Sequence, residues 1–329
     1  MLYPLKFEPQ YQYRLWGGNK LRKILGKKDA PEMTGESWEI SALEDAVSVV
    51  KEGPLAGNNL EELIEVFLGD LVGDQVYEKF GREFPLLIKL IDAQQVLSVQ
   101  VHPGDDMARE RHQAYGKTEM WYVIQADPGA TLYTGFNQLV DRESFIIHLN
   151  QKTLPQILNK EQVAAGDVFF LPAGRVHATG AGILLAEIQQ TSDITYRIYD
   201  WDRVDRDGQP RRLHTDLALD AIDFTYHKEY RTNYTEKPDQ VNEVVRCTYF
   251  TTNFIPLNRP LERDYYKLDS FVVCMCLEGS LKIHYKDHSQ VMLTRGETLL
   301  LPAVFKHIRL EPVEKSSILE IYIETDKTK

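Results

Sequence analysis

This chain of 329 residues has few cysteines, fewer basic than acidic residues and no long apolar run, and these features argue against several classes of protein. Its three cysteines, Cys247, Cys274 and Cys276, are too few for a disulfide framework and lack the spacing of a cysteine-rich zinc site. Lysine and arginine number 38 against 49 aspartates and glutamates, and the net charge of −11 argues against general nucleic-acid binding. No apolar run is long enough to span a membrane, and the N-terminus lacks a signal-peptide pattern. We therefore expect a cytoplasmic protein with no nucleic-acid partner and no membrane partner.

What the chain does contain suits a large globular core and about two domains. Hydrophobic residues make up 43% of the sequence. The interval of about 59–81 has helical spacing of its apolar residues, with Asn59 placed to cap the first helix, and residues 141–158 are expected to form two short helices. Most other apolar runs are short and bounded by turn residues, which is typical of β-strands. Residues 200–238, with a turn at Asp207-Gly208, are expected to run over the surface as a connection.

The most informative stretch is Val99-Gln100-Val101-His102-Pro103. Alternate side chains of a strand point the same way, so Gln100 and His102 share one face and the two valines share the other. Valines suit a packed face, and the opposite face then lines a cavity. Histidine is the commonest metal ligand and glutamine can supply an oxygen, so the pattern favours a metal site.

Two later residues complete a possible ligand set. Glu119 begins the strand-like run 119–124, and His177 follows a strand that ends in the turn Pro172-Ala173-Gly174. A lone strand histidine is more often a hydrogen-bonded structural residue, and a lone glutamate is more often solvated. Together, however, Gln-x-His, the following Glu and Gly-x5-Pro-x-Gly-x2-His predict a bound divalent metal. They resemble the paired motifs of a cupin, a small β-barrel with a metal inside its mouth.

The second half of the chain repeats the first. Residues 296–307 overlay residues 166–177, and the same alignment places Asp269 where Glu119 stands. No Gln-x-His precedes Asp269, so His307 is expected to be structural. We predict a mainly β fold of two cupin (jelly-roll) barrels with a small helical insertion. Residues 1–240 would form the catalytic domain, with its helical segment at about 59–81, and residues 241–329 a degenerate second domain.

Six motifs together resemble the type I mannose-6-phosphate isomerases in their shorter bacterial form. They are Gly35-Glu36-Ser37-Trp38-Glu39, Pro85-Leu86-Leu87-Ile88-Lys89, Leu97-Ser98-Val99-Gln100-Val101-His102-Pro103, Lys117-Thr118-Glu119-Met120, Pro172-Ala173-Gly174-Arg175-Val176-His177 and Ser192-Asp193-Ile194-Thr195-Tyr196-Arg197. The resemblance implies an enzyme that interconverts mannose 6-phosphate and fructose 6-phosphate. It also implies one zinc ion per chain, with the four ligands Gln100, His102, Glu119 and His177.

The implied reaction moves a proton between C1 and C2 through an enediolate, which a metal would stabilise. It needs a base. Glu187, on the strand after His177, and Lys117, on the same strand face as Glu119, are both candidates. Arg197 is expected to stabilise the enediolate or hold the substrate, and Lys89 to bind phosphate or a sugar oxygen. The structural alternative for Glu187 is an ion pair with Arg197, and for Lys89 a side chain that reaches solvent at the barrel rim.

Other functions are compatible with the same barrel. A non-catalytic sugar-phosphate sensor or an isomerase of a related aldose would use the same pocket. A metal-dependent dioxygenase usually has a histidine-rich iron triad, so Gln100 argues against that class. We expect a small sugar phosphate as the partner, and a monomer or weak homodimer.

Overall fold

The computed structural model describes residues 1–204, 208–286 and 288–324, and their strands fall into two groups along the chain. The first group is β1 (Gln10–Gly18), β2 (Thr34–Ile40), β3 (Leu86–Ala93), β4 (Val99–Val101), β5 (Glu119–Ala126), β6 (Thr131–Phe136), β7 (Leu158–Gln162), β8 (Val168–Leu171), β9 (His177–Ala178), β10 (Ile183–Gln190), β11 (Tyr196–Tyr199) and β12 (Arg231–Thr232). The second group is β13 (Asn242–Arg246), β14 (Thr251–Leu257), β15 (Leu261–Asp264), β16 (Val272–Glu278), β17 (Ser280–Lys286), β18 (Ser289–Thr294), β19 (Thr298–Leu301), β20 (His307–Pro312) and β21 (Ser316–Tyr322).

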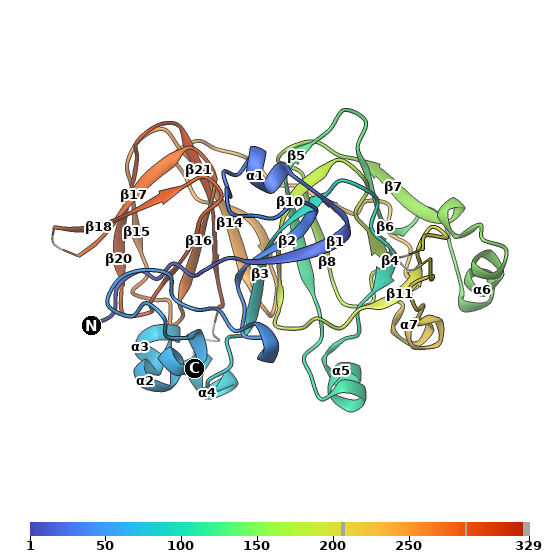
Figure 1. The fold of residues 1–329 in the computed structure, drawn as a ribbon, viewed down its shortest axis with the longest axis horizontal. Coiled ribbons are helices and arrows are strands. Elements are labelled where there is room, and N and C mark those ends of the chain that lie inside the picture. The colour runs from blue at the N-terminus through green and yellow to red at the C-terminus, as the bar shows by residue number, and fades with distance from the viewer. Residues whose placement is uncertain (205–207, 287, 325–329) are drawn as a thin grey trace.

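Each group forms one β-barrel, and the two barrels lie side by side (Figure 1). In the described residues, the first barrel pairs a seven-stranded sheet, β1-β2-β3-β10-β5-β8-β12, with a five-stranded sheet, β11-β4-β9-β6-β7. The second pairs a five-stranded sheet, β13-β14-β21-β16-β19, with a four-stranded one, β15-β20-β17-β18. The prediction of a mainly β, two-barrel fold is confirmed. The strand groups change near residue 240, but the division into two domains stays a prediction.

The helices are short and lie outside the barrels. They are α1 (Lys20–Lys23), α2 (Leu60–Phe67), α3 (Gly69–Val72), α4 (Asp74–Phe80), α5 (Asp105–His112), α6 (Arg142–Asn150) and α7 (Thr215–Ala221), with 3-10 turns η1 (Glu44–Ala46) and η2 (Leu154–Gln156). The helical interval expected at about 59–81 is present as α2 to α4, and Asn59 caps α2 by accepting a hydrogen bond from the Glu62 amide at 2.9 Å. These helices pack beneath the second barrel, where the Phe271 amide bonds the Val72 carbonyl at 3.1 Å.

Two expectations for irregular segments were only partly met. Residues 141–158 contain α6 and a single 3-10 turn, with Pro155 within that turn. The stretch 200–238 is not a plain surface connection, because α7 buries Ala218 and Leu219, and β12 pairs with β8 at the sheet edge. A helix of seven residues makes only about two turns and gives little periodic signal, which explains the error. The turn expected at Asp207-Gly208 includes a residue outside the described part of the chain.

A continuous apolar core connects the barrels. It includes buried residues of both strand groups, and the ring of Tyr122 stacks on that of Phe254 at 5.3 Å between centroids. Near the N-terminus, Leu5 exchanges two backbone hydrogen bonds of 2.8 Å with Leu300 of β19. The first residues of the chain therefore reach across to the second barrel, and the two barrels are packed as one body.

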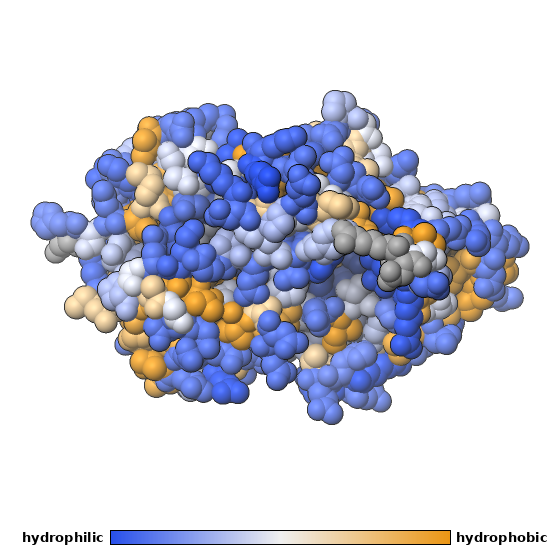
Figure 2. All heavy atoms as spheres, viewed as in Figure 1, coloured by the Kyte–Doolittle hydropathy of each residue, from blue (hydrophilic) through white to orange (hydrophobic). Residues whose placement is uncertain are grey.

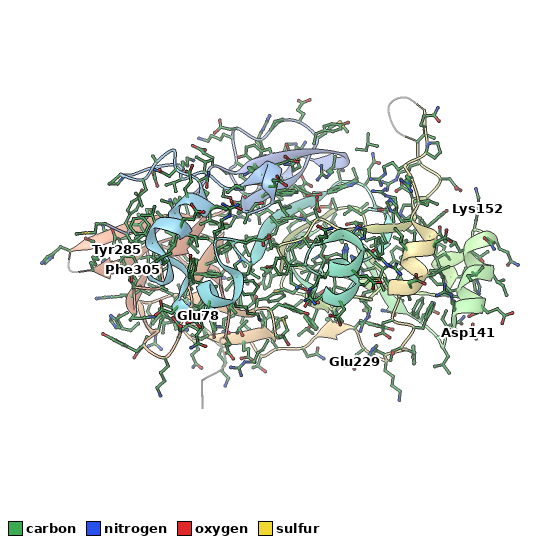
Figure 3. All side chains as sticks on the ribbon, turned by 90° about the horizontal axis from the view of Figure 1, so that it is seen from below. Glu78, Asp141, Lys152, Glu229, Tyr285 and Phe305 are labelled. Carbon is green, nitrogen blue, oxygen red and sulfur yellow. The ribbon has the colours of Figure 1, made fainter. Side chains whose placement is uncertain are left out.

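The surface around this core is mostly hydrophilic, with apolar residues in small patches on the face in Figure 2. Viewed from below, Asp141 and Lys152 mark the end of the molecule near α6, and Tyr285 and Phe305 mark the opposite end (Figure 3). Within the described ranges, no helix has both the length and the apolar character needed to cross a membrane.

The strand register corrects the repeat alignment. Glu119 pairs with Leu171 of β8, whereas Leu301, the repeat counterpart of Leu171, pairs with Val272. Val272, and not Asp269, therefore stands at the Glu119 position. The Asp269 carboxylate instead accepts hydrogen bonds of 2.9 Å from two backbone amides at the start of α4. The alignment was wrong by three residues because apolar strands contain little to fix their register.

The same register identifies a counterpart of Glu187 in the second barrel. Glu187 lies opposite Trp121, and Glu320 lies opposite Cys274, the residue that corresponds to Trp121. Glu320 is completely buried and accepts two hydrogen bonds from Arg263, at 2.7 and 2.9 Å, and one of 2.6 Å from the Tyr265 hydroxyl. An internal ion pair therefore takes up this part of the second barrel. His307, expected to be structural, has a side chain that is 58% exposed on the outside of the second barrel.

Candidate metal centre and active site

The candidate metal ligands come from the two facing sheets of the first barrel. Gln100 of β4 and His177 of β9 are direct neighbours in the five-stranded sheet, and His102 follows β4. Glu119 begins β5 in the seven-stranded sheet. Ligand atoms of His102, Glu119 and His177 all lie within 4.8 Å of one another, and all three residues are buried. Closure of the barrel thus brings together the residues that the sequence singled out.

Hydrogen bonds orient both imidazoles toward the centre of this cluster. Nδ1 of His102 lies 2.8 Å from the Ile194 carbonyl oxygen, and Nδ1 of His177 lies 2.8 Å from that of Arg175. A carbonyl only accepts, so each Nδ1 carries a proton and each Nε2 keeps its lone pair. Burial lowers the pKa of both rings, that of His177 to about 4. Neutral imidazoles held by backbone carbonyls are the form that binds a metal.

The other two residues complete an oxygen and nitrogen donor set. Oε1 of Glu119 is buried without a hydrogen-bond partner in the described residues, while Oε2 forms an ion pair with Lys117. Burial and the nearby Glu187 carboxylate raise the pKa of Glu119, against the opposing effect of Lys117. The amide of Gln100 lies 3.1 Å from Nε2 of His177, and rotation of this amide would present its oxygen. An unpaired buried carboxylate oxygen beside two imidazole nitrogens fits a divalent cation.

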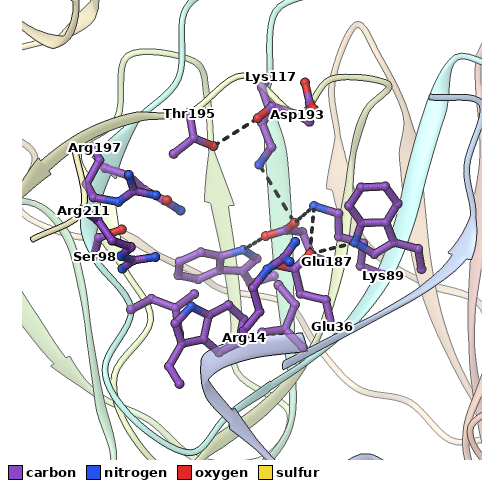
Figure 4. A pocket seen from close by; sticks show the side chains of 16 residues that line it. Arg14, Glu36, Lys89, Ser98, Lys117, Glu187, Asp193, Thr195, Arg197 and Arg211 are labelled. Atoms are coloured by element: carbon purple, nitrogen blue, oxygen red, sulfur yellow. Dashed lines mark hydrogen bonds and ion pairs between the residues drawn. The ribbon is translucent and has the colours of Figure 1, made fainter. Parts of the chain in front are cut away.

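A cavity of about 370 Å³ adjoins this cluster, because its lining residues Gln100 and Lys117 contact His177 and His102, and Figure 4 shows the side chains that line it. The predicted site residues that line it are Lys89, Gln100, Lys117, Glu187 and Arg197. Its volume is within the range typical of small-molecule pockets. The remaining three predicted ligands lie behind this lining.

Glu187 is held at the centre of the pocket wall. In β10 it pairs with Lys89 of β3 on one side and Trp121 of β5 on the other, so the three side chains share a face. Its Oε1 lies 3.1 Å from Nζ of Lys89 and 3.9 Å from Nζ of Lys117, and its Oε2 accepts a hydrogen bond of 2.8 Å from the Trp121 indole. Burial alone would raise the pKa of Glu187, but the two ammonium groups lower it. Glu187 is therefore an anion.

The ion pair of Glu187 is with Lys89 and not with Arg197, the alternative that the sequence left open. Lys89 is only 6% exposed and does not reach solvent. Lys117 is buried as well, with Nζ 3.2 Å from Nε2 of His102. Burial alone would lower the pKa of Lys117, but the charges of Glu119 and Glu187 raise it, so the group is protonated. Two ammonium groups therefore flank one carboxylate at the pocket floor.

Arg197 lies on the wall of the pocket opposite Lys89 (Figure 4). Its β11 position pairs with Gln100, which places the two side chains on one face. One Nη atom of Arg197 donates to the Arg212 carbonyl at 3.0 Å, but its buried Nε has no hydrogen-bond partner among the described residues. Arg197 thus lines the pocket with a guanidinium group that has no carboxylate partner within hydrogen-bond distance in the described residues.

Sequence reasoning missed several lining residues, among them Arg14, Trp38, Glu36 and Arg211. Glu36 is buried, accepts hydrogen bonds from Arg14 at 2.8 Å and from the Trp38 indole at 2.7 Å, and has its Oε2 3.9 Å from Nζ of Lys89. Its position two residues before Trp38 in a strand was a signal that the two share a face. Arg211 follows an irregular segment, and no pattern in the sequence points to it.

Comparisons with known proteins agree with this geometry. Residues 4–123 match a family model described as phosphomannose isomerase type I, catalytic domain. Over 314 residues the chain is 33% identical to the mannose-6-phosphate isomerase ManA of Bacillus subtilis, covering 94% of this chain and 96% of that protein. It is 42% identical over 226 residues to a mannose-6-phosphate isomerase of Streptococcus mutans, covering 68% of each. The crystal structure of a Bacillus subtilis mannose 6-phosphate isomerase superimposes with a TM-score of 0.87 at 30% identity, covering 98% of this chain and 100% of that one.

Proposed function

This chain belongs to the type I phosphomannose isomerase family, and from that premise we propose that it interconverts mannose 6-phosphate and fructose 6-phosphate with the aid of one zinc ion. The observation that carries the proposal is the buried cluster of His102, Glu119 and His177 behind a pocket lined by Glu187 and Lys117. Proton transfer beside a carbonyl needs a base and stabilisation of the developing negative charge, and a metal centre next to a fixed carboxylate and ammonium could supply both.

The ion would be held by Gln100, His102, Glu119 and His177. These oxygen and nitrogen donors suit zinc, and a site without cysteine that borders a cavity leaves room for a water or a substrate oxygen on the metal, as in catalytic rather than closed structural sites. When bound, a divalent cation would supply positive charge that stabilises the enediolate.

We propose Glu187 as the group that takes the proton from C2 and returns it to C1. Its carboxylate lines the pocket and is ionised, whereas Lys117, the other candidate base, is protonated and so cannot accept a proton as it stands. The Trp121 and Lys89 hydrogen bonds fix both oxygens of Glu187, which reduces the cost of orienting the carboxylate toward the sugar.

The positively charged side chains then have complementary roles. The Lys117 ammonium, between the metal ligands and Glu187, would stabilise negative charge on the reacting oxygens. The guanidinium group of Arg197 would donate to the substrate from the opposite wall. Lys89 primarily holds Glu187, and its remaining hydrogens would reach a sugar hydroxyl.

The test is an assay of the purified protein for fructose 6-phosphate formed from mannose 6-phosphate, after treatment with a chelator and again after adding zinc back. We expect turnover that the chelator abolishes and zinc restores. Absence of turnover by folded protein with one metal per chain would exclude this substrate. Binding of the sugar phosphate without turnover would favour a sensor, and turnover of another aldose would favour a related isomerase.

A further inference from the structure

We propose that Arg14 and Arg211 form the subsite for the phosphate group of the substrate, an inference that rests on the proposed function. Both residues line the cavity, and neither bonds a candidate metal ligand or Glu187 within the described residues. They reach the pocket from separate parts of the fold, Arg14 from β1 and Arg211 from the chain between β11 and α7. Figure 4 shows Arg211 beside Arg197 on one side of the pocket and Lys89 and Glu36 on the other.

Arg211 is held in place by a nearly buried carboxylate. Its Nε and one Nη donate to the two oxygens of Asp200, at 2.7 and 2.6 Å, and Asp200 is only 5% exposed. Arg203 donates to the same carboxylate at 2.5 Å. One negative charge is therefore shared by two guanidinium groups, which leaves a net positive charge beside the pocket. The two-point contact fixes the plane of Arg211 and leaves its other Nη to face a ligand.

Arg14 is held in the same manner by Glu36. Its Nε donates to Oε1 of Glu36 at 2.8 Å, and one Nη donates to the Tyr13 carbonyl at 3.1 Å. Glu36 is buried. Burial alone would raise its pKa, but Lys89 and Arg14 lower it, so its charge is maintained. In Figure 4, Arg14 extends from β1 into the pocket. Both arginines are thus preorganised by buried acids rather than free in solvent.

A further observation points to an anion at this place. Arg197 lies beside Arg211 in the pocket lining (Figure 4), and burial together with the positive charge of Arg211 lowers the pKa of Arg197. Arg197 forms no ion pair in the described residues, and its buried Nε is unpartnered. Arg197, Arg203 and Arg211 thus gather around the single carboxylate of Asp200, and this excess of positive charge favours binding of an anion. A phosphate group offers several oxygens to guanidinium groups of this geometry, whereas a neutral sugar hydroxyl offers no charge.

The test uses a hexitol 6-phosphate, which has no carbonyl group and cannot isomerise, together with the same hexitol lacking phosphate. Their affinities are measured by calorimetry for the metal-loaded protein and for Arg14→Gln, Arg211→Gln and Arg211→Lys. Arg246→Gln is the matched control, because Arg246 forms a comparable two-point ion pair with Glu324 far from the pocket. Thermal melting confirms that each variant is folded.

We expect each glutamine variant to weaken binding of the hexitol phosphate about tenfold or more, and Arg211→Lys to weaken it less. Binding of the plain hexitol and of the control variant should be unchanged. For mannose 6-phosphate, KM should rise more than kcat falls. The proposal is overturned if the wild type binds both hexitols equally, or if the glutamine variants behave as the control does. These outcomes are independent of whether the wild type isomerises mannose 6-phosphate, which tests the proposed function itself.

Discussion

The hydroxyl of Tyr249, in the second barrel, donates a hydrogen bond of 2.7 Å to Oδ2 of Asp105, at the start of α5 in the first. The other oxygen of Asp105 accepts from the Gly116 amide and from the Gln190 side chain, both at 2.9 Å, and Gln190 in turn accepts from the Thr118 amide at 2.9 Å. These bonds fix the backbone at Gly116 and Thr118, on either side of Lys117 and directly before Glu119. The second barrel therefore supports the candidate active site from behind.

This relationship predicts that Tyr249→Phe lowers kcat several-fold while KM changes little, because Lys117 and Glu119 become less well positioned. The loss of one hydrogen bond should lower the free energy of unfolding by about 1 kcal/mol. Kinetics and denaturant unfolding provide the two measurements. Tyr226→Phe, at a partly exposed tyrosine outside the pocket, is the control. A variant that loses stability but keeps full kcat would mean that the contact only joins the barrels.

Replacement of Glu187 by Gln removes the proposed base but keeps the shape of the side chain. We expect kcat to fall by about 10²–10⁴-fold, with the folded structure and the metal content retained. Exchange of the C2 hydrogen of mannose 6-phosphate with deuterated solvent, followed by NMR, should disappear in parallel. Persistent exchange in Glu187→Gln, together with its loss in Lys117→Met, would transfer the role of base to Lys117.

Substitution of His102 by Ala should remove one ligand of the proposed metal centre. Elemental analysis of dialysed protein should give about one zinc per chain for the wild type and a large loss for His102→Ala, with activity lost in proportion. His307→Ala is the matched control, because His307 ends the equivalent turn of the second barrel but lies on its surface. Equal metal content in all three proteins would place the metal elsewhere.

The stability of the protein at low pH should depend on the ion pairs that Asp200 forms with Arg203 and Arg211. Burial alone would raise its pKa, but hydrogen bonds from Arg211 and Arg203 lower it below the ordinary value of 3.8. A carboxyl with a lowered folded-state pKa stabilises the fold above its unfolded-state pKa, and this contribution disappears as pH falls through the folded-state value. We expect Asp200→Asn to be about 1–2 kcal/mol less stable than the wild type at pH 6–7, with the difference shrinking below about pH 4.

Urea unfolding at several pH values measures this dependence. Asp220→Asn is the control, since Asp220 pairs with Arg111 and Arg142 at the surface, where solvent screens the charges. A stability difference for Asp200→Asn that stays constant down to pH 3 would contradict the assignment of the effect to the ionised carboxyl.

The sequence alone predicted the strands around the candidate metal centre and singled out the residues proposed as its ligands. Alternation placed Gln100 and His102 on one face, with Val99 and Val101 packed on the other, because a strand fixes this by its period of two. Asn59 and the apolar spacing after it determined α2, because capping and helical periodicity are local properties. The six motifs then identified the family, since the order and spacing of chemically specialised residues are preserved in the chain itself.

Only the tertiary structure decided which charged residues meet. Lys89 pairs with Glu187, and Arg211 with Asp200, because strand neighbours and loop paths are fixed by long-range packing that local patterns do not encode. Closure of the barrel added Arg14 and Glu36 to the pocket. The register of the second barrel, which replaced Asp269 by Val272 as the counterpart of Glu119, likewise depends on hydrogen-bond pairing between distant strands. Local periodicity specifies which side of an element a residue occupies, whereas its partners across the barrel are set by the fold.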